Sequence, residues 1–201
     1  MKKCCTMKEQ RKETVNKKTT VCGIVAVGPN DVIGCDGIMP WYSRRDLYHF
    51  KILTTPNPCV FGKTTFMNLP VQPLPKRLNV VCSSAYKNKL CNGVLYVNSL
   101  ENAIESCDMF PYVFICGGAK IYKYALQHDL IDVMYITKIN DEILSENVVQ
   151  HPDRYVRFPV NTDVFFGSDK WVVKKLIYPE NALPKDYETV KTKFFKCCRV
   201  R

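Results

Sequence analysis

The chain alternates between short apolar runs and segments whose apolar residues recur at helical spacing. The first run, residues 21–27, ends in Gly28-Pro29-Asn30, which is typical of a strand buried on both faces and followed by a turn. Similar runs predict further strands. These are 59–62, 78–82, 94–97, 112–116 and 134–139, with two late strands at 171–178 and 190–198.

Helical spacing is clearest over residues 44–53. Ser43 is a typical N-cap residue, and Leu47, Phe50 and Leu53 form one apolar stripe behind it. Other helices are predicted at 66–68, after Ser99 and at 119–127.

Loops are expected at 34–37 and in the proline-rich segment 69–75, and no regular element is predicted between 140 and 170. Strands that alternate with helices predict parallel strand pairs, whereas the two late strands have no helix between them. We therefore expect an α/β single domain with a predominantly parallel central β-sheet, antiparallel C-terminal strands and about four flanking helices.

Length and composition fit one globular domain. Of 201 residues, 46% are apolar and 24% charged, unlike disordered or fibrous chains. The net charge of +10 is concentrated at the ends, because residues 1–20 hold seven Lys or Arg against two Glu and residues 185–201 hold six against two acids. We expect a basic, flexible N-terminal extension over 1–19 and a folded domain over 20–201.

The cysteine pattern indicates a reducing compartment. None of the eleven cysteines belongs to a Cys-x-x-Cys pair, and the three histidines lie far apart, so no metal site is predicted. Cys22, Cys59, Cys82 and Cys116 lie within apolar runs and are expected to be small core residues. Without a signal peptide or a run long enough to span a membrane, the cytoplasm is the expected location.

Asp46 is the first candidate for chemistry. It lies four residues before Phe50 and seven before Leu53, which places its carboxyl on or beside the apolar stripe. A carboxyl in apolar surroundings is paired, protonated with a raised pKa, or kept for a ligand. A first-turn acid stabilised by the helix dipole is the plainer interpretation. Trp41 just before it and Phe50 just after it favour a ligand site.

Three strand ends carry groups suited to phosphate. Gly62-Lys63-Thr64-Thr65 and Cys116-Gly117-Gly118 each lead into a predicted helix, and Ser83-Ser84 follows a third strand. The carboxyl ends of parallel strands meet at one edge of a sheet, where ligands bind. Asn57 stands where a Walker loop needs glycine, so Gly62-Lys63-Thr64 is not a Walker loop. Three such junctions together suit a dinucleotide with separate phosphates. Lys63, Lys120 and the hydroxyl groups would suit a 2′-phosphate, which favours NADPH over NADH.

Several motifs in the same order carry a family resemblance. They are Val32-Ile33-Gly34, Met39-Pro40-Trp41, Asp46-Leu47 with Phe50-Lys51, Phe61-Gly62-Lys63-Thr64-Thr65, Pro73-Leu74-Pro75 with Arg77-Leu78-Asn79, Cys82-Ser83-Ser84, Cys116-Gly117-Gly118 and Phe158-Pro159. Over about residues 21–198 the chain resembles dihydrofolate reductases. The resemblance implies NADPH-dependent reduction of 7,8-dihydrofolate to 5,6,7,8-tetrahydrofolate, by hydride transfer to C6 with protonation of N5. It also implies a part in one-carbon metabolism and thymidylate synthesis, and binding of antifolates.

The resemblance also implies roles for individual residues. Catalytic roles fall to Asp46, Trp41 and Thr137, with Asp46 binding the pterin and Thr137 hydrogen-bonded to it. Substrate-binding positions are Ile24, Val25, Leu47, Phe50, Leu69, Arg77 and Cys116, of which Arg77 would pair with the glutamate α-carboxylate. Cofactor-binding positions are Ala26, Ile33, Gly37, Met39, Gly62, Lys63, Thr64, Thr65, Cys82, Ser83, Ser84, Gly117, Gly118, Ala119, Lys120, Ile121 and Tyr122.

Three alternatives remain open at this point. A pyrimidine or deazaflavin-type reductase would share the fold, although Trp41, Asp46 and Arg77 together favour a pterin with a glutamate tail. A nucleic-acid-binding role of the basic ends predicts affinity that falls steeply with salt. A catalytically silent homologue is disfavoured by the intact Asp46 and Thr137. The protein is expected to be a monomer.

Overall fold

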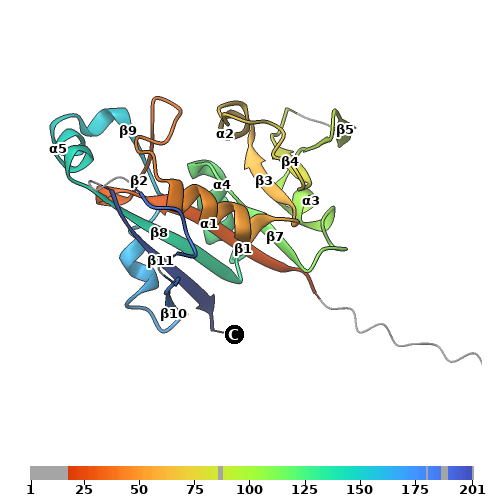
Figure 1. Cartoon of the computed structure of the whole chain (residues 1–201). Helices are drawn as coiled ribbons and strands as arrows, with labels where there is room; N and C mark the ends of the chain where they lie inside the picture. The colour runs from red at the N-terminus through yellow and green to blue at the C-terminus, as the bar shows by residue number, and fades with distance from the viewer. Residues whose placement is uncertain (1–17, 86–87, 180, 187–189, 201) are drawn as a thin grey trace, which may run out of the picture.

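The computed structural model describes residues 18–85, 88–179, 181–186 and 190–200. Its centre is a nine-stranded sheet with the strand order β10-β11-β8-β1-β7-β3-β4-β6-β5 (Figure 1). The strands of this sheet are β1 (Thr20–Val27), β3 (Cys59–Gly62), β4 (Asn79–Cys82), β5 (Lys89–Cys91), β6 (Val94–Val97), β7 (Tyr112–Ile115), β8 (Val133–Asp141), β10 (Trp171–Leu176) and β11 (Val190–Arg199).

The strand directions confirm the predicted α/β fold. Neighbouring strands from β8 through β1, β7, β3 and β4 to β6 run parallel. The two late strands, β10 and β11, are antiparallel to each other, and β11 is antiparallel to β8. The parallel strands are apolar because helices cover both faces of the sheet.

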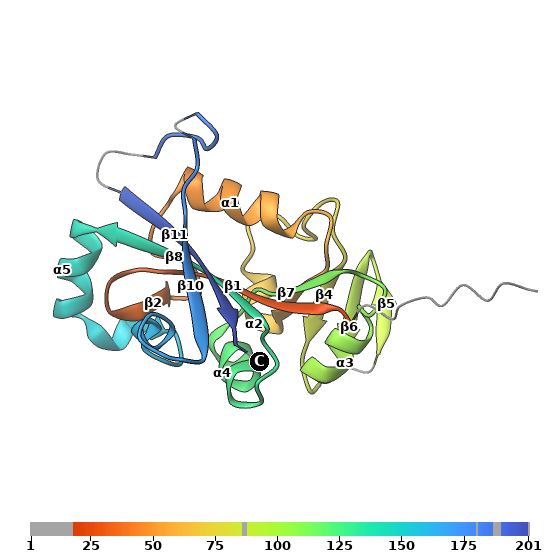
Figure 2. The same ribbon diagram turned by 90° about the horizontal axis from the view of Figure 1, so that it is seen from below.

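Helices lie on the two faces as Figure 2 shows, with α1 (Arg44–Thr54) on one side and α3 (Leu100–Glu105) and α4 (Ala119–Gln127) on the other. Phe50 and Leu53 of α1 and Phe66 of α2 (Lys63–Met67) pack against a cluster that contains Cys22, Ile24, Phe61 and Phe114. We call this the α1 face. Tyr122 and Ala125 of α4 pack with Val25, Ile115 and Ile136 on the opposite face.

Four elements were not predicted. Helix α5 (Glu142–Gln150) follows β8, so the described residues form five α-helices where about four were predicted. The Asp141 carboxylate caps α5 by accepting the Leu144 N–H, and Leu144 and Val148 are buried among its described side chains. The strands β2 (Val32–Cys35) and β9 (Tyr155–Arg157) pair with each other in a small separate sheet, and β5 is a short edge strand.

The C-terminal end of the chain agrees with the predicted late strand, and the N-terminal end is described only from residue 18. Residues 1–17 of the predicted extension lie outside the described residues. Thr19 is buried, and its hydroxyl contacts the carbonyl oxygens of Asp108 and Phe110 at 2.9 Å, so this residue packs against the folded domain. The basic C-terminal segment is largely strand β11, between β8 and β10. Its Arg199 pairs with Asp129.

Candidate active site

The start of α1 holds Asp46 in place. Ser43 has an extended backbone and its Oγ accepts the Asp46 N–H at 3.0 Å, which caps the helix. Asp46 is 8% exposed, and His49, one turn further, is 1% exposed. The predicted stripe is confirmed for Phe50 and Leu53, which are half-buried on the α1 face, whereas Leu47 is 40% exposed at its rim.

Burial changes the acidity of the Asp46 carboxyl. Loss of water contact raises its pKa to about 6, and the negative charge of Asp186 acts in the same direction. The Thr137 hydroxyl on β8 donates a hydrogen bond to the carboxylate and opposes the rise. Thr137 is itself buried and pairs with Ala26 of β1. Asp46 is thus a carboxyl group that can hold and release a proton near neutral pH.

The raised pKa predicts a cost in stability. Below about pH 3.9 both folded and unfolded Asp46 are protonated; as the pH rises towards 6, only the unfolded chain loses its proton, so the free energy of unfolding falls. The unfolding free energy of Asp46→Asn, relative to wild type, is expected to grow by about 3 kcal/mol between about pH 3.5 and pH 7. Urea titrations of both proteins across this range measure it, and a constant difference would contradict the raised pKa.

Apolar side chains and one cation continue from Asp46 along the α1 face. Phe50 and Leu69, both predicted to bind substrate, are half-buried in one cluster with Leu53 and Leu74. The guanidinium of Arg77 lies 5.6 Å from the centre of the Phe50 ring, and its Nη1 donates to Thr54 Oγ1 at 2.8 Å. Arg77 therefore stands at the far end of α1 from Asp46.

The two glycine-containing junctions are in direct contact. The Gly62 N–H at the end of β3 donates to the Gly117 carbonyl after β7, at 2.7 Å. Gly117 has a φ of +111°, and a Cβ on Gly118 would lie 2.6 Å from Thr65 Oγ1. Tyr122 in α4 donates its hydroxyl proton to the Ile24 carbonyl of β1 at 2.5 Å. These contacts bring β1, β3 and β7 together at one edge of the sheet.

Two other predicted cofactor positions lie at the end of the neighbouring strand β4. Cys82 ends the neighbouring strand β4 and is buried, and Ser83 follows it with its N–H bonded to the Val97 carbonyl at 2.9 Å. The exposed residues of the predicted set are Gly37, Met39, Lys63, Thr64, Ser84 and Lys120. The half-buried ones are Ala26, Ile33, Gly62, Thr65, Ser83, Gly118, Ala119 and Ile121.

Three predicted site residues lie in different surroundings: Val25, Trp41 and Cys116. The Val25 side chain belongs to the opposite core, which contains α4, so only its backbone lies beside the α1 face. Trp41 is 8% exposed, and its Nε1 is buried without a partner among the described residues. Cys116 is half-buried on the α1 face, and burial raises the pKa of its thiol. Cys116 therefore packs against the cluster that contains Phe50, whereas Trp41 packs in a separate cluster with Val32, Ile139 and Leu144.

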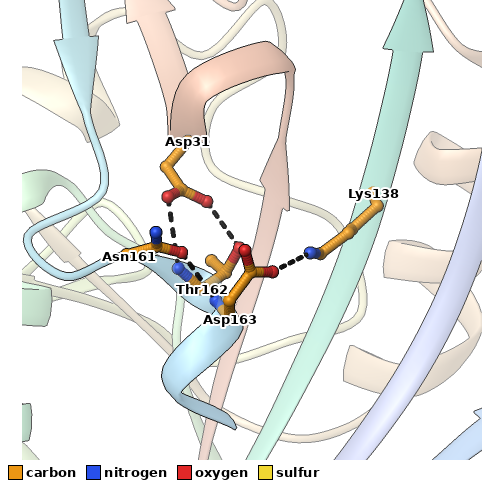
Figure 3. Close-up of polar contacts among 5 residues, drawn as sticks. All are labelled: Asp31, Lys138, Asn161, Thr162 and Asp163. Carbon is orange, nitrogen blue, oxygen red and sulfur yellow. Dashed lines mark hydrogen bonds and ion pairs between the residues drawn. The ribbon is translucent and has the colours of Figure 1, made fainter. Parts of the chain in front are cut away.

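Contacts from later in the chain hold the turn before β2, ahead of the loop that carries Met39, and sequence reasoning missed them. Figure 3 shows Asp31 accepting the Thr162 hydroxyl at 2.5 Å and the Thr162 N–H at 3.2 Å, while Lys138 and Asp163 form an ion pair at 2.8 Å. Asp31 belongs to the short 3-10 turn Pro29–Asp31, and Thr162 begins another, Thr162–Phe165. These residues are more than a hundred positions apart, and no local pattern links them.

A second missed contact fixes the middle of the loop that carries Met39. The Asn68 side chain, at the end of α2, donates to the Gly37 carbonyl at 2.9 Å. It joins the loop to the junction that carries Lys63 and Thr64. Asn68 follows a predicted helix, but nothing in its own surroundings in the sequence points to Gly37.

Two kinds of feature are absent from the part of the chain that the structure describes. It contains no group of three or more His, Cys, Asp or Glu side chains arranged to hold a metal ion. No helix there combines the length and the apolar character needed to cross a membrane.

Fold and site together define an α/β protein whose candidate ligand-binding edge lies at the carboxyl ends of parallel strands. A family model described as dihydrofolate reductase matches residues 20–165. The dihydrofolate reductase of Mycobacterium leprae is 35% identical over 158 residues, covering 77% of this chain and 90% of that protein. That of Candida albicans is 30% identical over 158 residues, covering 74% and 81%. The chain belongs to the dihydrofolate reductase family.

The fold is also similar to that of a solved structure. Dihydrofolate reductase from Enterococcus faecalis, complexed with NADP(H) and RAB-propyl, aligns with a TM-score of 0.66. The alignment covers 90% of this chain and 97% of that chain at 23% sequence identity. At this identity the likeness supports the fold, and family membership rests on the sequence matches.

Proposed function

We propose that the protein is an NADPH-dependent dihydrofolate reductase, which converts 7,8-dihydrofolate to 5,6,7,8-tetrahydrofolate for one-carbon metabolism and thymidylate synthesis. The observation that carries the proposal is the buried Asp46, hydrogen-bonded to Thr137 and bordered by an apolar cluster beside two paired glycine junctions. Family membership supports the same reaction.

The chain's own residues divide the work as follows. Asp46 binds the pyrimidine edge of the pterin and assists protonation of N5, and Thr137 orients its carboxylate. Trp41 and the loop with Met39 exclude water. The carbonyls of Ile24 and Cys116 face the ring, Leu47, Phe50 and Leu69 flank the aminobenzoyl group, and Arg77 pairs with the glutamate α-carboxylate.

The glycine junctions suit NADPH. A Cβ at Gly118 would lie too close to Thr65, so glycine, which has no side chain, is the residue that fits at this position. The N-terminus of α4 offers backbone N–H groups to a phosphate, and Lys63, Thr64, Ser83 and Lys120 would contact the remaining phosphates. When bound, NADPH supplies the hydride for C6 of dihydrofolate.

The test is oxidation of NADPH by the purified protein in the presence of dihydrofolate. We expect turnover that requires both compounds and is much slower with NADH. A folded protein that shows no turnover would overturn the proposal. Turnover of an aminopyrimidine without a glutamate tail, in place of dihydrofolate, would indicate the alternative reductase.

Arg77→Lys is expected to raise the KM for dihydrofolate by about 10- to 100-fold with little change in kcat. The planar guanidinium, held by Thr54, can form two parallel bonds to a carboxylate, whereas a lysine forms one. Steady-state kinetics measure the effect, and a dihydropterin without glutamate serves as the control because its KM should not change. An equal rise for both substrates would place the role of Arg77 elsewhere.

We further propose that the protein acts in the cytoplasm as a monomer and binds antifolates. Nine cysteines in the described residues are free, which supports a reducing compartment. Light scattering tests the monomer, and protection against thermal unfolding tests antifolate binding. Nucleic-acid binding by the basic ends would be a secondary activity.

A further inference from the structure

The loop between β10 and β11 lies beside the start of α1 (Figure 2). Asp186 in this loop has one carboxylate oxygen 2.8 Å from the Ser43 hydroxyl, which donates to it. The other oxygen accepts the backbone N–H of Arg45 at 3.1 Å. Asp186 thus satisfies a backbone donor in the first turn of α1, 141 residues away in the sequence.

The loop is held by contacts that do not involve Asp186. Leu183 is 4% exposed. The Tyr178 hydroxyl lies 2.7 Å from His49 Nδ1, and the His49 ring packs at 4.3 Å from that of Phe194 in β11. Burial lowers the pKa of His49 to about 4, so this histidine is neutral at physiological pH. Leu183 and Tyr178 therefore anchor the described part of this loop without the help of Asp186.

A short chain of hydrogen bonds links Asp186 to Asp46. Ser43 donates its hydroxyl proton to Asp186, and the same Ser43 oxygen accepts the Asp46 N–H at 3.0 Å. We propose that Asp186 is a positioning residue of the reductase reaction, which fixes the first turn of α1 through Ser43 and places a negative charge beside Asp46. This inference rests on the proposed proton role of Asp46.

The charges around Asp46 give the direction of the effect. The Thr137 hydroxyl from β8 favours the ionised carboxylate, and Asp186 opposes ionisation. Tyr122 from α4 is neutral, because burial raises the pKa of its phenol far above the usual range. On α1 itself, His49 is neutral. The cation Arg45 lines an open cavity of about 390 Å³, and Asp186, Lys185 and Lys191 line the same cavity. Asp186 is thus an acid near Asp46 that helps to retain its proton.

Asp186→Asn tests this inference, because it removes the charge but keeps an oxygen acceptor. At low ionic strength, the midpoint at which the hydride-transfer rate falls with rising pH should move down by roughly half a pH unit. The rate near pH 7 should then fall about threefold, since a smaller fraction of Asp46 holds a proton. The carbon-13 chemical shift of the Asp46 carboxyl, followed with pH, should show the same displacement without any turnover.

Two matched variants separate charge from structure. Asp169→Asn removes an exposed aspartate from the turn before β10 and should leave both midpoints unchanged. Asp186→Glu keeps the charge and should restore most of the wild-type profile. If Asp186→Asn does not fold, Asp186→Ser replaces it: the hydroxyl keeps an oxygen acceptor without the charge, and the midpoint should move down by a similar amount.

An Asp186→Asn enzyme with wild-type midpoints would overturn the inference, even if its stability or kcat were lower, because such losses indicate a structural cap only. Failure of the proposed function would be recognised by a different result. Full activity in Asp46→Asn would show that Asp46 takes no part in the reaction, independently of any result for Asp186. A shifted Asp46 titration together with an inactive Asp46→Asn supports both.

Discussion

Replacing Asp46 by asparagine is expected to lower kcat for dihydrofolate reduction by about 100- to 1000-fold near pH 7. Asparagine keeps the shape of the carboxyl group but cannot take up and release a proton. Asp46 is buried and bonded to Thr137, and among the described residues it is the carboxyl group on the apolar α1 face beside the glycine junctions. Single-turnover measurements with NADPH bound first give the hydride-transfer rate directly.

The pH profile distinguishes proton handling from simple damage to the site. The wild-type rate should fall as the pH rises through about 6, where Asp46 loses its proton. The Asp46→Asn rate should recover partly at low pH, where dihydrofolate carries its own proton at N5. Because this variant is expected to gain stability at neutral pH, its loss of activity cannot be ascribed to unfolding. A variant that retains the wild-type rate and profile would remove Asp46 from the mechanism.

Much of the fold followed from local patterns. The strands β1, β3, β4, β6 and β7 are short apolar runs whose ends differ from the predicted ranges by no more than one residue. Helix α1 was predictable because Ser43 caps it and Phe50 and Leu53 repeat at helical spacing. The burial of Asp46 followed from the same spacing, since its side chain shares a face with these apolar residues.

What could not be predicted depends on contacts between distant parts of the chain. Strand β2 has four residues and is stabilised by β9, more than a hundred positions later, so its sequence resembles a loop. Two pairs of polar residues are brought into contact only by the tertiary structure. They are Asp31 with Thr162 and Ser43 with Asp186. Helix α5 is different, because its cap at Asp141 and its apolar pair Leu144 and Val148 are local and were overlooked.

The charge at the chain ends shows how composition can mislead about position. Lys196 belongs to the C-terminal basic segment, yet its ammonium lies 5.7 Å from the centre of the Tyr135 ring within the main sheet. Composition counts charges along the sequence, but strand pairing decides which of them face solvent.

Gly118→Ala is the second change from which we expect a large effect. The added Cβ would lie 2.6 Å from Thr65 Oγ1, a separation that requires the Thr65 side chain or the backbone beside it to shift. We expect a loss of about 1 to 3 kcal/mol in the free energy of unfolding. We also expect NADPH affinity to fall at least about tenfold, because the contacts between these junctions position the phosphate-binding backbone.

A double mutant identifies the cause. Thr65→Ala removes the oxygen that the new Cβ would meet, so Gly118→Ala/Thr65→Ala should regain most of the stability that Gly118→Ala loses. Gly167→Ala is the matched control, because nothing lies within 4 Å of a Cβ at that position. Urea unfolding measures stability, and NADPH fluorescence measures affinity. If stability recovers but NADPH affinity does not, a side chain at Gly118 itself interferes with cofactor binding. If neither recovers, the contact with Thr65 is not what excludes a side chain at this position.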